Sequence, residues 1–302
     1  AMNNLLLLIL CFIVGMVLHR FKRMPDNAPA TLNSFIIHVS LPALTLLYIH
    51  GVQFSSTVFL TALMAWLVFG FSVLFFYYVG RFLALPRATV GTLMLLGGLG
   101  NTSFFGLPMV EAFYGHAAIT TAIVADLLGS FFVLSILGIS VAGWYSHTPP
   151  TALQLLKRIA IFPPFLALLV ALILLPVDYA DWFSQLLKRL GDTLAPLALL
   201  SVGLQLRLAD FAAHRRNVLL GLSFKLLLAP LAIYLLYVQL LGARGEAMQV
   251  TIFEAAMPPM ITAAIIAAEH HLDAKLANLM VAIGLLISFA SLTLWYWLLH
   301  SV

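Results

Sequence analysis

The sequence predicts an all-α polytopic membrane protein with ten transmembrane helices, and its composition is the first reason. Of its 302 residues, 63% are hydrophobic and only 9% are charged, whereas a soluble domain carries about 25% charged residues. The mean hydropathy of +1.08 excludes both a soluble globule and a disordered chain. The apolar residues form long unbroken runs and not the short alternating segments of a membrane β-barrel, so we expect the spans to be helices.

Each span is predicted from a run of about 20 mainly apolar residues, the length that crosses the hydrocarbon core. The longest polar stretches between the runs are 20–30, 143–158 and 176–190, and all are too short for a separate domain. The ten predicted spans are 3–19, 31–50, 57–80, 89–111, 116–142, 159–175, 191–207, 217–241, 247–268 and 273–299.

The orientation is predicted from Lys and Arg, which collect in cytoplasmic loops. Eleven lie in odd-numbered loops: Arg20, Lys22, Arg23, Arg81, Arg87, Lys157, Arg158, Arg207, Arg215, Arg216 and Lys275. Three lie elsewhere outside the spans: Lys188, Arg189 and Arg244. This asymmetry predicts a multi-pass protein of the cell membrane, most simply a bacterial inner membrane, with both termini outside. The net charge of +4 then reflects topology, so nucleic acid is not an expected partner.

Related features in the two halves of the chain predict an internal repeat. Pro42 in span two and Pro196 in span seven are 154 positions apart, and Pro108 in span four and Pro258 in span nine are 150 apart. We therefore expect residues 1–150 and 151–302 to form two five-helix repeats. Because five is odd, the second repeat must be inverted, as is typical of secondary transporters.

Spans four and nine are predicted to be broken helices that cross near the midplane. Within span four, residues 96–108 combine four glycines with Asn101, Thr102, Ser103 and Pro108, and span nine contains Pro258 and Pro259. Glycine weakens a helix and proline removes a hydrogen-bond donor. Open backbone at membrane depth is tolerated where it lines a cavity or is packed in protein.

The chemistry of such a crossing suits a charged solute. Amides at the beginnings of half-helices attract an anionic group such as a carboxylate, while carbonyls at their ends attract a cation. A pair of purely structural kinks is the alternative. The predicted substrate-binding residues are Gly100, Asn101, Thr102, Ser103, Pro108, Met257, Pro258, Pro259 and Thr262.

Three ionisable residues lie deep in the predicted spans, where each costs several kcal/mol without a partner. Glu254 is predicted to bind the coupling ion or carry a proton, with Asn101 and Asp126 contributing. Asp126 could instead pair with Lys225 or hold the backbone of the crossing. Lys225 is the predicted charge partner, although it could also attract an anionic substrate or snorkel toward water. For both carboxyl groups, a structural role is the alternative.

The span-four sequence Gly100-Asn101-Thr102-Ser103-Phe104-Phe105-Gly106-Leu107-Pro108 resembles the fourth-span motif of the auxin efflux carrier family. Leu41-Pro42-Ala43-Leu44 resembles its second-span motif, and 194–203 its seventh. Asp126, Lys225 with Pro230, and Ala256-Met257-Pro258-Pro259 fall where bacterial members have similar residues. The resemblance implies two inverted five-span repeats, a scaffold and a mobile transport domain, elevator-type movement, and often a homodimer.

The resemblance also implies a substrate class and an ion. Plant relatives export the weak acid auxin, and bacterial relatives are associated with small carboxylates such as malate or malonate. The more distantly similar bile-acid sodium symporters have an acidic residue near the span-nine crossing that helps to bind sodium. By this likeness, Asn101, Ser103 and Glu254 would supply oxygen ligands for a sodium ion, the one cofactor to be expected.

We therefore predict a secondary active transporter that moves a small organic anion by alternating access, coupled to sodium or protons. The alternative is a membrane sensor, receptor or channel for small organic acids without coupled transport. An enzyme is not expected, because the sequence has neither the His-Glu-x-x-His motif nor the Gly-x-Ser-x-Gly motif. The expected partners are the lipid bilayer and the organic acid.

Overall fold

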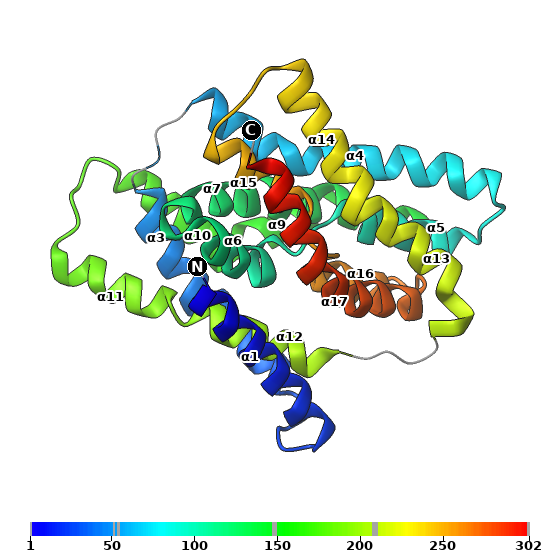
Figure 1. The fold of residues 1–302 in the computed structure, drawn as a ribbon, viewed down its shortest axis with the longest axis horizontal. Helices are drawn as coiled ribbons and strands as arrows, with labels where there is room; N and C mark the ends of the chain where they lie inside the picture. Colours follow the sequence, from blue (N-terminus) through cyan, green and yellow to red (C-terminus); the bar gives the residue numbers. More distant parts are fainter. Residues whose placement is uncertain (1, 51, 53–54, 147–149, 207–210, 301–302) are drawn as a thin grey trace.

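The computed structural model describes residues 2–50, 52, 55–146, 150–206 and 211–300, and their regular structure is helical (Figure 1). No β-strand occurs among these residues. Several long helices contain π-helical turns, labelled η together with one short 3₁₀ turn, η3. Arg207, one of the eleven basic residues used to predict orientation, lies outside the described residues.

The first half of the chain contains the helices of predicted spans one to five. They are α1 (Met2–Arg20), α2 (Ala28–Phe35), η1 (Ile36–Ser40), α3 (Leu41–Ile49), α4 (Ser56–Phe82), α5 (Arg87–Gly98), η2 (Thr102–Gly106), α6 (Leu107–Tyr114), η3 (His116–Ala118), α7 (Ile119–Val124), η4 (Ala125–Phe131), η5 (Leu134–Gly138) and α8 (Ile139–Tyr145).

The second half contains predicted spans six to ten and two additional short helices. The elements are α9 (Ala152–Ala160), α10 (Pro163–Ile173), α11 (Asp181–Gly191), α12 (Leu194–Gln205), α13 (Phe211–Ser223), η6 (Phe224–Leu228), α14 (Ala229–Tyr234), η7 (Leu235–Leu240), α15 (Glu246–Ala255), α16 (Ile261–Glu269) and α17 (Ala274–Leu299).

Five helices in the described residues are long and apolar enough to cross a membrane. They are Ala28–Ile49, Ser56–Phe82, His116–Tyr145, Phe211–Leu240 and Ala274–Leu299, and they coincide with predicted spans two, three, five, eight and ten. A bent pair, Ala152–Ala160 with Pro163–Ile173, would make a sixth. A polytopic membrane protein is thus confirmed, whereas the count of ten spans stays a prediction.

The other predicted spans lack one long helix for identifiable reasons. Spans four and nine are interrupted at 99–101 and 256–260, where glycine and proline prevent a continuous helix. Span seven corresponds to α12, which is only 12 residues long. Span one corresponds to α1, whose described apolar part is Leu6–Arg20.

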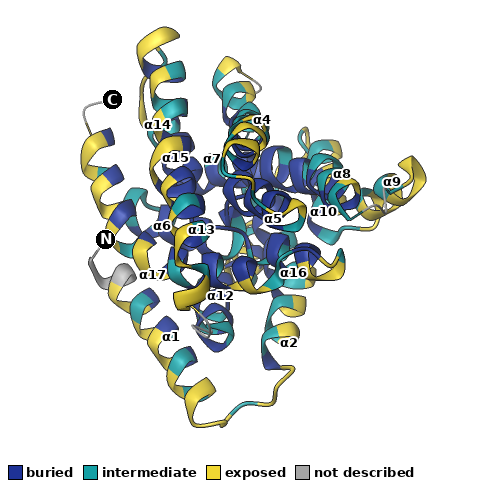
Figure 2. Cartoon of the chain, turned by 90° about the vertical axis from the view of Figure 1, so that its right-hand side faces the viewer, coloured by how far each residue is buried: buried dark blue, intermediate teal, exposed yellow. Residues whose placement is uncertain are grey.

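The helices form two packing groups. In the outer group, α1 packs along α12, while α3 packs against α10 and α11. In the central group, α4 packs against α5 and α15, and α17 packs against α5 and α16. Buried residues concentrate at the centre, and exposed residues follow the outer sides of α1, α9 and α14 (Figure 2). The groups meet where α12 contacts η2 and α3 contacts α7.

Two glycines allow α1 and α12 to approach closely. A Cβ at Gly203 would lie 2.3 Å from the carbonyl oxygen of Phe12, and a Cβ at Gly15 would lie 2.4 Å from that of Leu200. Small residues permit such contacts between membrane helices, where van der Waals packing has to hold helices together. Both contacts are with backbone, so an added methyl group would push the helices apart.

Gly203→Ala is therefore expected to destabilise the protein by about 2 kcal/mol, the usual scale of overpacking. The matched control is Gly70→Ala in α4, because a Cβ at Gly70 meets nothing within 4 Å. There the higher helix propensity of alanine should leave stability unchanged or slightly raised. Thermal unfolding in detergent, followed by tryptophan fluorescence, compares the two variants. Equal midpoints would contradict close packing of α1 on α12.

Candidate functional site

The two helix interruptions pair with each other through their backbones. The amide of Asn101 donates to the carbonyl oxygen of Pro258 at 2.8 Å, and the amide of Met260 donates to that of Leu99 at 2.9 Å. These bonds form an antiparallel bridge between Gly100 and Pro259. Pro258 and Pro259 have no amide hydrogen to donate, so Met260 supplies the donor from the second interruption. Segments about 150 residues apart in sequence thus share one buried crossing.

Four helix ends meet at this crossing. α5 and α15 end there, at Gly98 and Ala255, so both bring their carbonyl ends. η2 and α16 begin there, at Thr102 and Ile261, so both bring their amide ends. The partial charges of helix termini make such a place suitable for both an anion and a cation.

Asp126 in η4 receives the hydroxyls of the first interruption. Thr102 Oγ1 and Ser103 Oγ both donate to Asp126 Oδ1 at 2.5 Å. Hydrogen bonds to an ionised acceptor are short and strong. Asp126 therefore holds the beginning of η2 in place, and it forms no ion pair with Lys225 in the described residues. Of the two structural roles considered for Asp126, pairing with Lys225 and holding the crossing, these contacts agree with the second, and a contribution to ion binding stays a prediction.

Lys225 in η6 reaches the second interruption. Its Nζ donates to the carbonyl oxygen of Ala255 at 2.6 Å, the last residue of α15. A Cβ at Gly100 would lie 3.3 Å from this Nζ, so glycine leaves room for the ammonium group. The cationic group thus lies at the carbonyl end of a half-helix, the position that the helix dipole favours.

Glu254 is the exceptional residue of the site. Neither carboxyl oxygen has a hydrogen-bond partner among the described residues, although both atoms are buried. A Cβ at Gly106 would lie 2.5 Å from Oε2 and 2.9 Å from Oε1, so the carboxyl group lies against the glycine at the end of η2. Its charge interacts with those of Asp126 and Lys225. Because an unpartnered buried carboxyl group costs free energy, its retention here points to a ligand or proton.

The polar residues of the crossing are deeply buried, and a second polar group among them is unpaired. Exposed fractions are 1% for Glu254 and Lys225, 2% for Asn101 and 4% for Asp126. Asn101 Nδ2 is buried and has no hydrogen-bond partner. One unpaired donor and one unpaired carboxyl group therefore remain next to the crossing.

The remaining predicted site residues take different positions. Met257, Pro258 and Pro259 are buried in the crossing segment itself. Thr262 lies in the first turn of α16 and is half-buried. Pro108 lies in the first turn of α6, away from the crossing and beside Glu111 and Leu194. The crossing therefore gathers the predicted residues apart from Pro108 and Thr262, which lie beyond its edges.

A cavity of about 610 Å³ opens at the end of the molecule where the first and seventh loops lie. It runs between the outer group and the central group, from the α1–α2 connection and α12 to α16 and α17. Ile261 lines it directly after the crossing segment. Its polar lining includes His19, Lys22, Asn33, Gln205 and Asn278.

The opposite end of the same boundary is closed. Only about 10 Å³ remains among residues such as Pro108, Glu111 and Asp192, which is too little for more than one water. Ser40 and Thr193 join α12 to the second span through a 2.8 Å hydroxyl contact. In the described residues, the boundary is thus open at one end, and around Pro108, Glu111 and Asp192 it is closed at the other.

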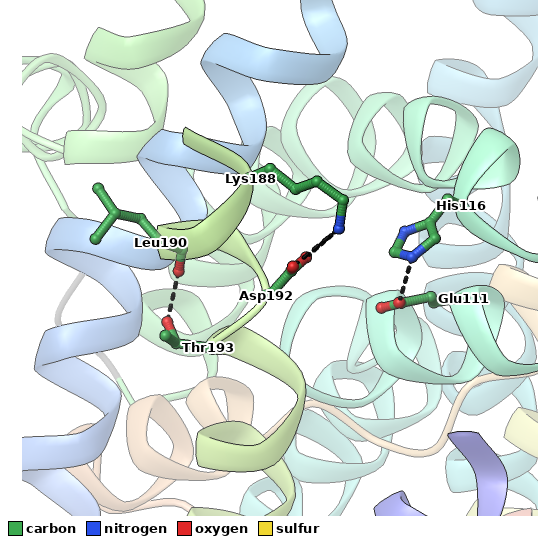
Figure 3. Close-up of polar contacts among 6 residues, drawn as sticks. All are labelled: Glu111, His116, Lys188, Leu190, Asp192 and Thr193. Atoms are coloured by element: carbon green, nitrogen blue, oxygen red, sulfur yellow. Dashed lines mark hydrogen bonds and ion pairs between the residues drawn. The ribbon is translucent and has the colours of Figure 1, made fainter. Parts of the chain in front are cut away.

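One ion pair and one histidine–carboxylate contact lie at this closed end (Figure 3). Lys188 Nζ lies 2.9 Å from Asp192 Oδ2, and His116 Nε2 lies 3.3 Å from Glu111 Oε1. The hydrogen bond that Lys188 donates to the carboxylate of Asp192 raises the pKa of Lys188. Because Lys188 and Asp192 are about half exposed, the pair contributes little to stability.

Sequence reasoning missed several residues that this geometry brings in. Gly106 makes room for Glu254, and the polar residues Asn33, Ser201 and Gln205 line or support the cavity. Ser201 donates to Asn33 Oδ1 at 2.6 Å, and Gln205 Nε2 donates to Ser201 Oγ at 3.1 Å. Ser201 and Gln205 are four residues apart, so they share one helix face. Two polar residues at this spacing in an apolar span were the sequence signal that could have indicated the cavity.

The residues present suit a proton or a hard cation better than a transition metal. No three His, Cys, Asp or Glu side chains of the described residues meet as a metal site. A sodium ion prefers oxygen ligands, and Glu254 offers two free oxygens. The hydroxyl of Ser103 is engaged as a donor to Asp126, although its oxygen retains lone pairs.

Comparison with known proteins places this geometry in a family. A family model described as "Membrane transport protein" matches residues 1–296. An uncharacterized transporter of Methanothermobacter thermautotrophicus is 27% identical over 301 residues, covering 97% of this chain and 96% of that protein. An uncharacterized transporter of Methanocaldococcus jannaschii is 26% identical over 311 residues, covering 99% and 98%. The chain therefore belongs to the membrane transport protein family, which is the auxin efflux carrier family that its span-four motif resembles.

Proposed function

We propose that this membrane transporter is a secondary active carrier of a small organic anion. The observation that carries the proposal is the buried crossing, where two unpaired polar groups, Asn101 Nδ2 and the carboxyl group of Glu254, lie beside four helix ends. Buried polar groups are normally satisfied. A solute and an ion that bind at the crossing, next to the open cavity, would supply partners for these two unpaired groups.

The anion would bind at the amide ends of η2 and α16. Their partial positive charge, the donor Nδ2 of Asn101 and the nearby ammonium group of Lys225 favour a carboxylate there. Lys22 at the cavity lining would attract an anion into the opening, and Asp26 in the same lining offsets part of this charge. A small carboxylate is also what the family likeness implies.

The coupling ion would bind at Glu254. Its two free oxygens suit a proton or, with Asn101 and Ser103, a sodium ion, and Asp126 adds a second negative charge nearby. Binding of a positive ion would remove the cost of the unpaired carboxyl group, so the ion and the anion would favour each other's binding. That mutual dependence is the basis of coupling.

Alternating access would come from movement of the central group against the outer group, as in an elevator. The cavity lies along the boundary between the two groups, open at the end predicted to be cytoplasmic and shut at the other. A sliding movement would close the first end and open the second. We propose that each group combines helices of both inverted five-span repeats, residues 1–150 and 151–302, with ten spans in all.

A thermal-shift screen of organic acids, including malate and malonate, tests this function with and without sodium. A ligand that binds only the folded state raises the unfolding midpoint by mass action. We expect a carboxylate to stabilise the protein, and to do so more strongly with sodium or at lower pH. Stabilisation without counterflow in proteoliposomes would favour the sensor, and uncoupled flux would favour the channel.

Asn101→Ala is expected to weaken binding of the stabilising acid about tenfold, the effect of one hydrogen bond to a charged group. Calorimetry of the purified protein measures the change. The matched control is Asn217→Ala in α13, away from the cavity and the crossing, which should bind as the wild type does. Unchanged affinity after Asn101→Ala would remove this residue from the site.

A further inference from the structure

Among the helices of the described residues, α9 is distinguished by having no buried residue. It begins with a capping box, in which Thr151 Oγ1 accepts from the amide of Gln154 at 3.3 Å and Gln154 Oε1 accepts from the amide of Thr151 at 2.8 Å. A capping box satisfies the free amides at a helix start locally. The helix is therefore defined by its own sequence more than by packing.

The faces of α9 are sharply divided. At 100° per residue, Leu155, Ile159, Leu156 and Leu153 follow one another around one side, whereas Gln154, Lys157 and Arg158 occupy the other. No acidic residue occurs in the helix. Such a helix, basic on its polar side and apolar on the other, is typical of segments that lie in a membrane surface.

The protein covers only part of the apolar face. Leu155 packs against the core, and Ile159 is half-buried. In contrast, Leu153, Leu156 and the following Ile161 are 74%, 63% and 63% exposed. The outer end of α9 projects from the rest of the molecule with its exposed side uncovered (Figure 2).

The connection to α10 fixes the direction of α9. Pro163 and Pro164 begin α10 and cannot continue α9, and the two helices meet at 65°. The ring of Phe162 at this elbow stacks on Phe131, with centroids 4.1 Å apart and planes 14° apart. If α10 crosses the membrane, α9 is turned toward its plane.

We propose that α9 lies in the headgroup layer of the membrane and binds anionic phospholipid through Lys157 and Arg158. Leu153 and Leu156 then enter the upper acyl region, and the two cations contact phosphate groups. The charge of Glu269 acts on Arg158 and opposes a phosphate there. The surroundings are nevertheless basic, because α9 lies at the end of the chain's odd-numbered loops, where eleven basic residues were counted.

Helix α11 provides an internal comparison. It is also amphipathic, with Trp182 and Leu186 exposed at 69% and 45%, and it follows α10 at the opposite end. Its charges cancel, because Asp181 and Asp192 balance Lys188 and Arg189, and Lys188 is paired with Asp192. An anionic lipid is therefore expected to bind α9 and not α11.

Spin labels in nanodiscs measure where α9 lies. Cys11 is the one cysteine of the chain, so a Cys11→Ala background permits single labels at Leu156→Cys and Gln154→Cys. We expect the Leu156 label to collide with oxygen at shallow lipid depth and the Gln154 label to collide with a water-soluble nickel chelate. The proposal is overturned if the Leu156 label is as deep as the bilayer centre, as exposed to water as a loop, or shielded from both reagents by protein.

A lipid titration tests the anionic preference. The unfolding midpoint is followed as phosphatidylglycerol replaces phosphatidylcholine in the nanodiscs. The Lys157→Gln/Arg158→Gln variant is expected to need about tenfold more phosphatidylglycerol for half of the stabilisation, while Lys188→Gln/Arg189→Gln on α11 behaves as the wild type. Equal behaviour of the two double variants would refute specific binding at α9.

Discussion

Glu254→Gln is expected to abolish ion-dependent transport and at the same time to make the protein more stable. The carboxyl group is 1% exposed and has no hydrogen-bond partner, so it lowers the stability of the folded chain. Glutamine has nearly the same volume but no charge, and it avoids the penalty of burying an ionisable group. We expect a gain of about 1 kcal/mol in the free energy of unfolding.

The rate of ion-driven transport should fall in the same variant, although its stability rises. Glutamine cannot carry a proton, and an amide is a weaker cation ligand than a carboxylate, so flux driven by a sodium or proton gradient should fall by at least about tenfold. The measurement is uptake of the acid identified by the thermal-shift screen, in proteoliposomes with each gradient imposed separately. A full sodium and pH response in the variant would refute the assignment of Glu254.

Glu111→Gln is the matched control. Glu111 lies on the half-helix of the other crossing span, and its carboxylate is paired with His116 at 3.3 Å. It already has a partner and lies at the closed end, so its replacement should bring no gain in stability. If stability rises and transport falls in Glu254→Gln but not in Glu111→Gln, the effect belongs to an ion site. A general effect of removing charge would appear in both variants.

The helix interruptions could be predicted from sequence because their causes are local. Glycine around Asn101 and proline at 258 and 259 act on the backbone within one turn, and an interruption in an apolar span can be recognised without knowing the fold. The same locality made Asp126, Lys225 and Glu254 visible, since a charge in an apolar run needs no structural context to be unusual.

The partners of those charges could not be predicted, because they depend on distant helices. Lys225 binds the carbonyl oxygen of Ala255, and a backbone acceptor leaves no trace in the sequence. Gly106 makes room for Glu254 from a different span. The open cavity was missed for the same reason, since it arises from the relative position of two helix groups and from polar residues such as Ser201 that are unremarkable alone.

Asp126→Ala is expected to have the largest effect on folding of any single change at the crossing. It would leave the hydroxyls of Thr102 and Ser103, which now donate to Asp126 Oδ1 at 2.5 Å, without an acceptor. Thr102 is 1% exposed, so water cannot replace the lost partner. Leaving a buried donor unsatisfied costs about 1–3 kcal/mol, and more when the lost partner was charged, so we expect a loss of about 3 kcal/mol.

Asp126→Asn separates the hydrogen bonds from the charge. The amide oxygen of asparagine can still accept from both hydroxyls, so stability should fall by less than half as much as with alanine, while the charge near Glu254 is removed. Thermal unfolding gives the first quantity, and uptake with an imposed sodium or proton gradient gives the second. Ser140→Ala is a suitable control, because this hydroxyl donates only to Ile136 of the same span.

Hydrogen exchange locates the damage. The amide of Gly106 donates to the carbonyl oxygen of Asn101 at 2.9 Å, so loosening of η2 in Asp126→Ala should speed its exchange, whereas α17 should remain protected. If exchange instead rises equally across the protein, Asp126 contributes to global stability without holding the crossing. If neither stability nor exchange at η2 changes, the two hydroxyl bonds are dispensable. Faster exchange confined to η2 in Asp126→Ala, together with preserved stability in Asp126→Asn, would show that the acceptor oxygen positions η2. The negative charge of the wild-type carboxylate would then be available to the ion site.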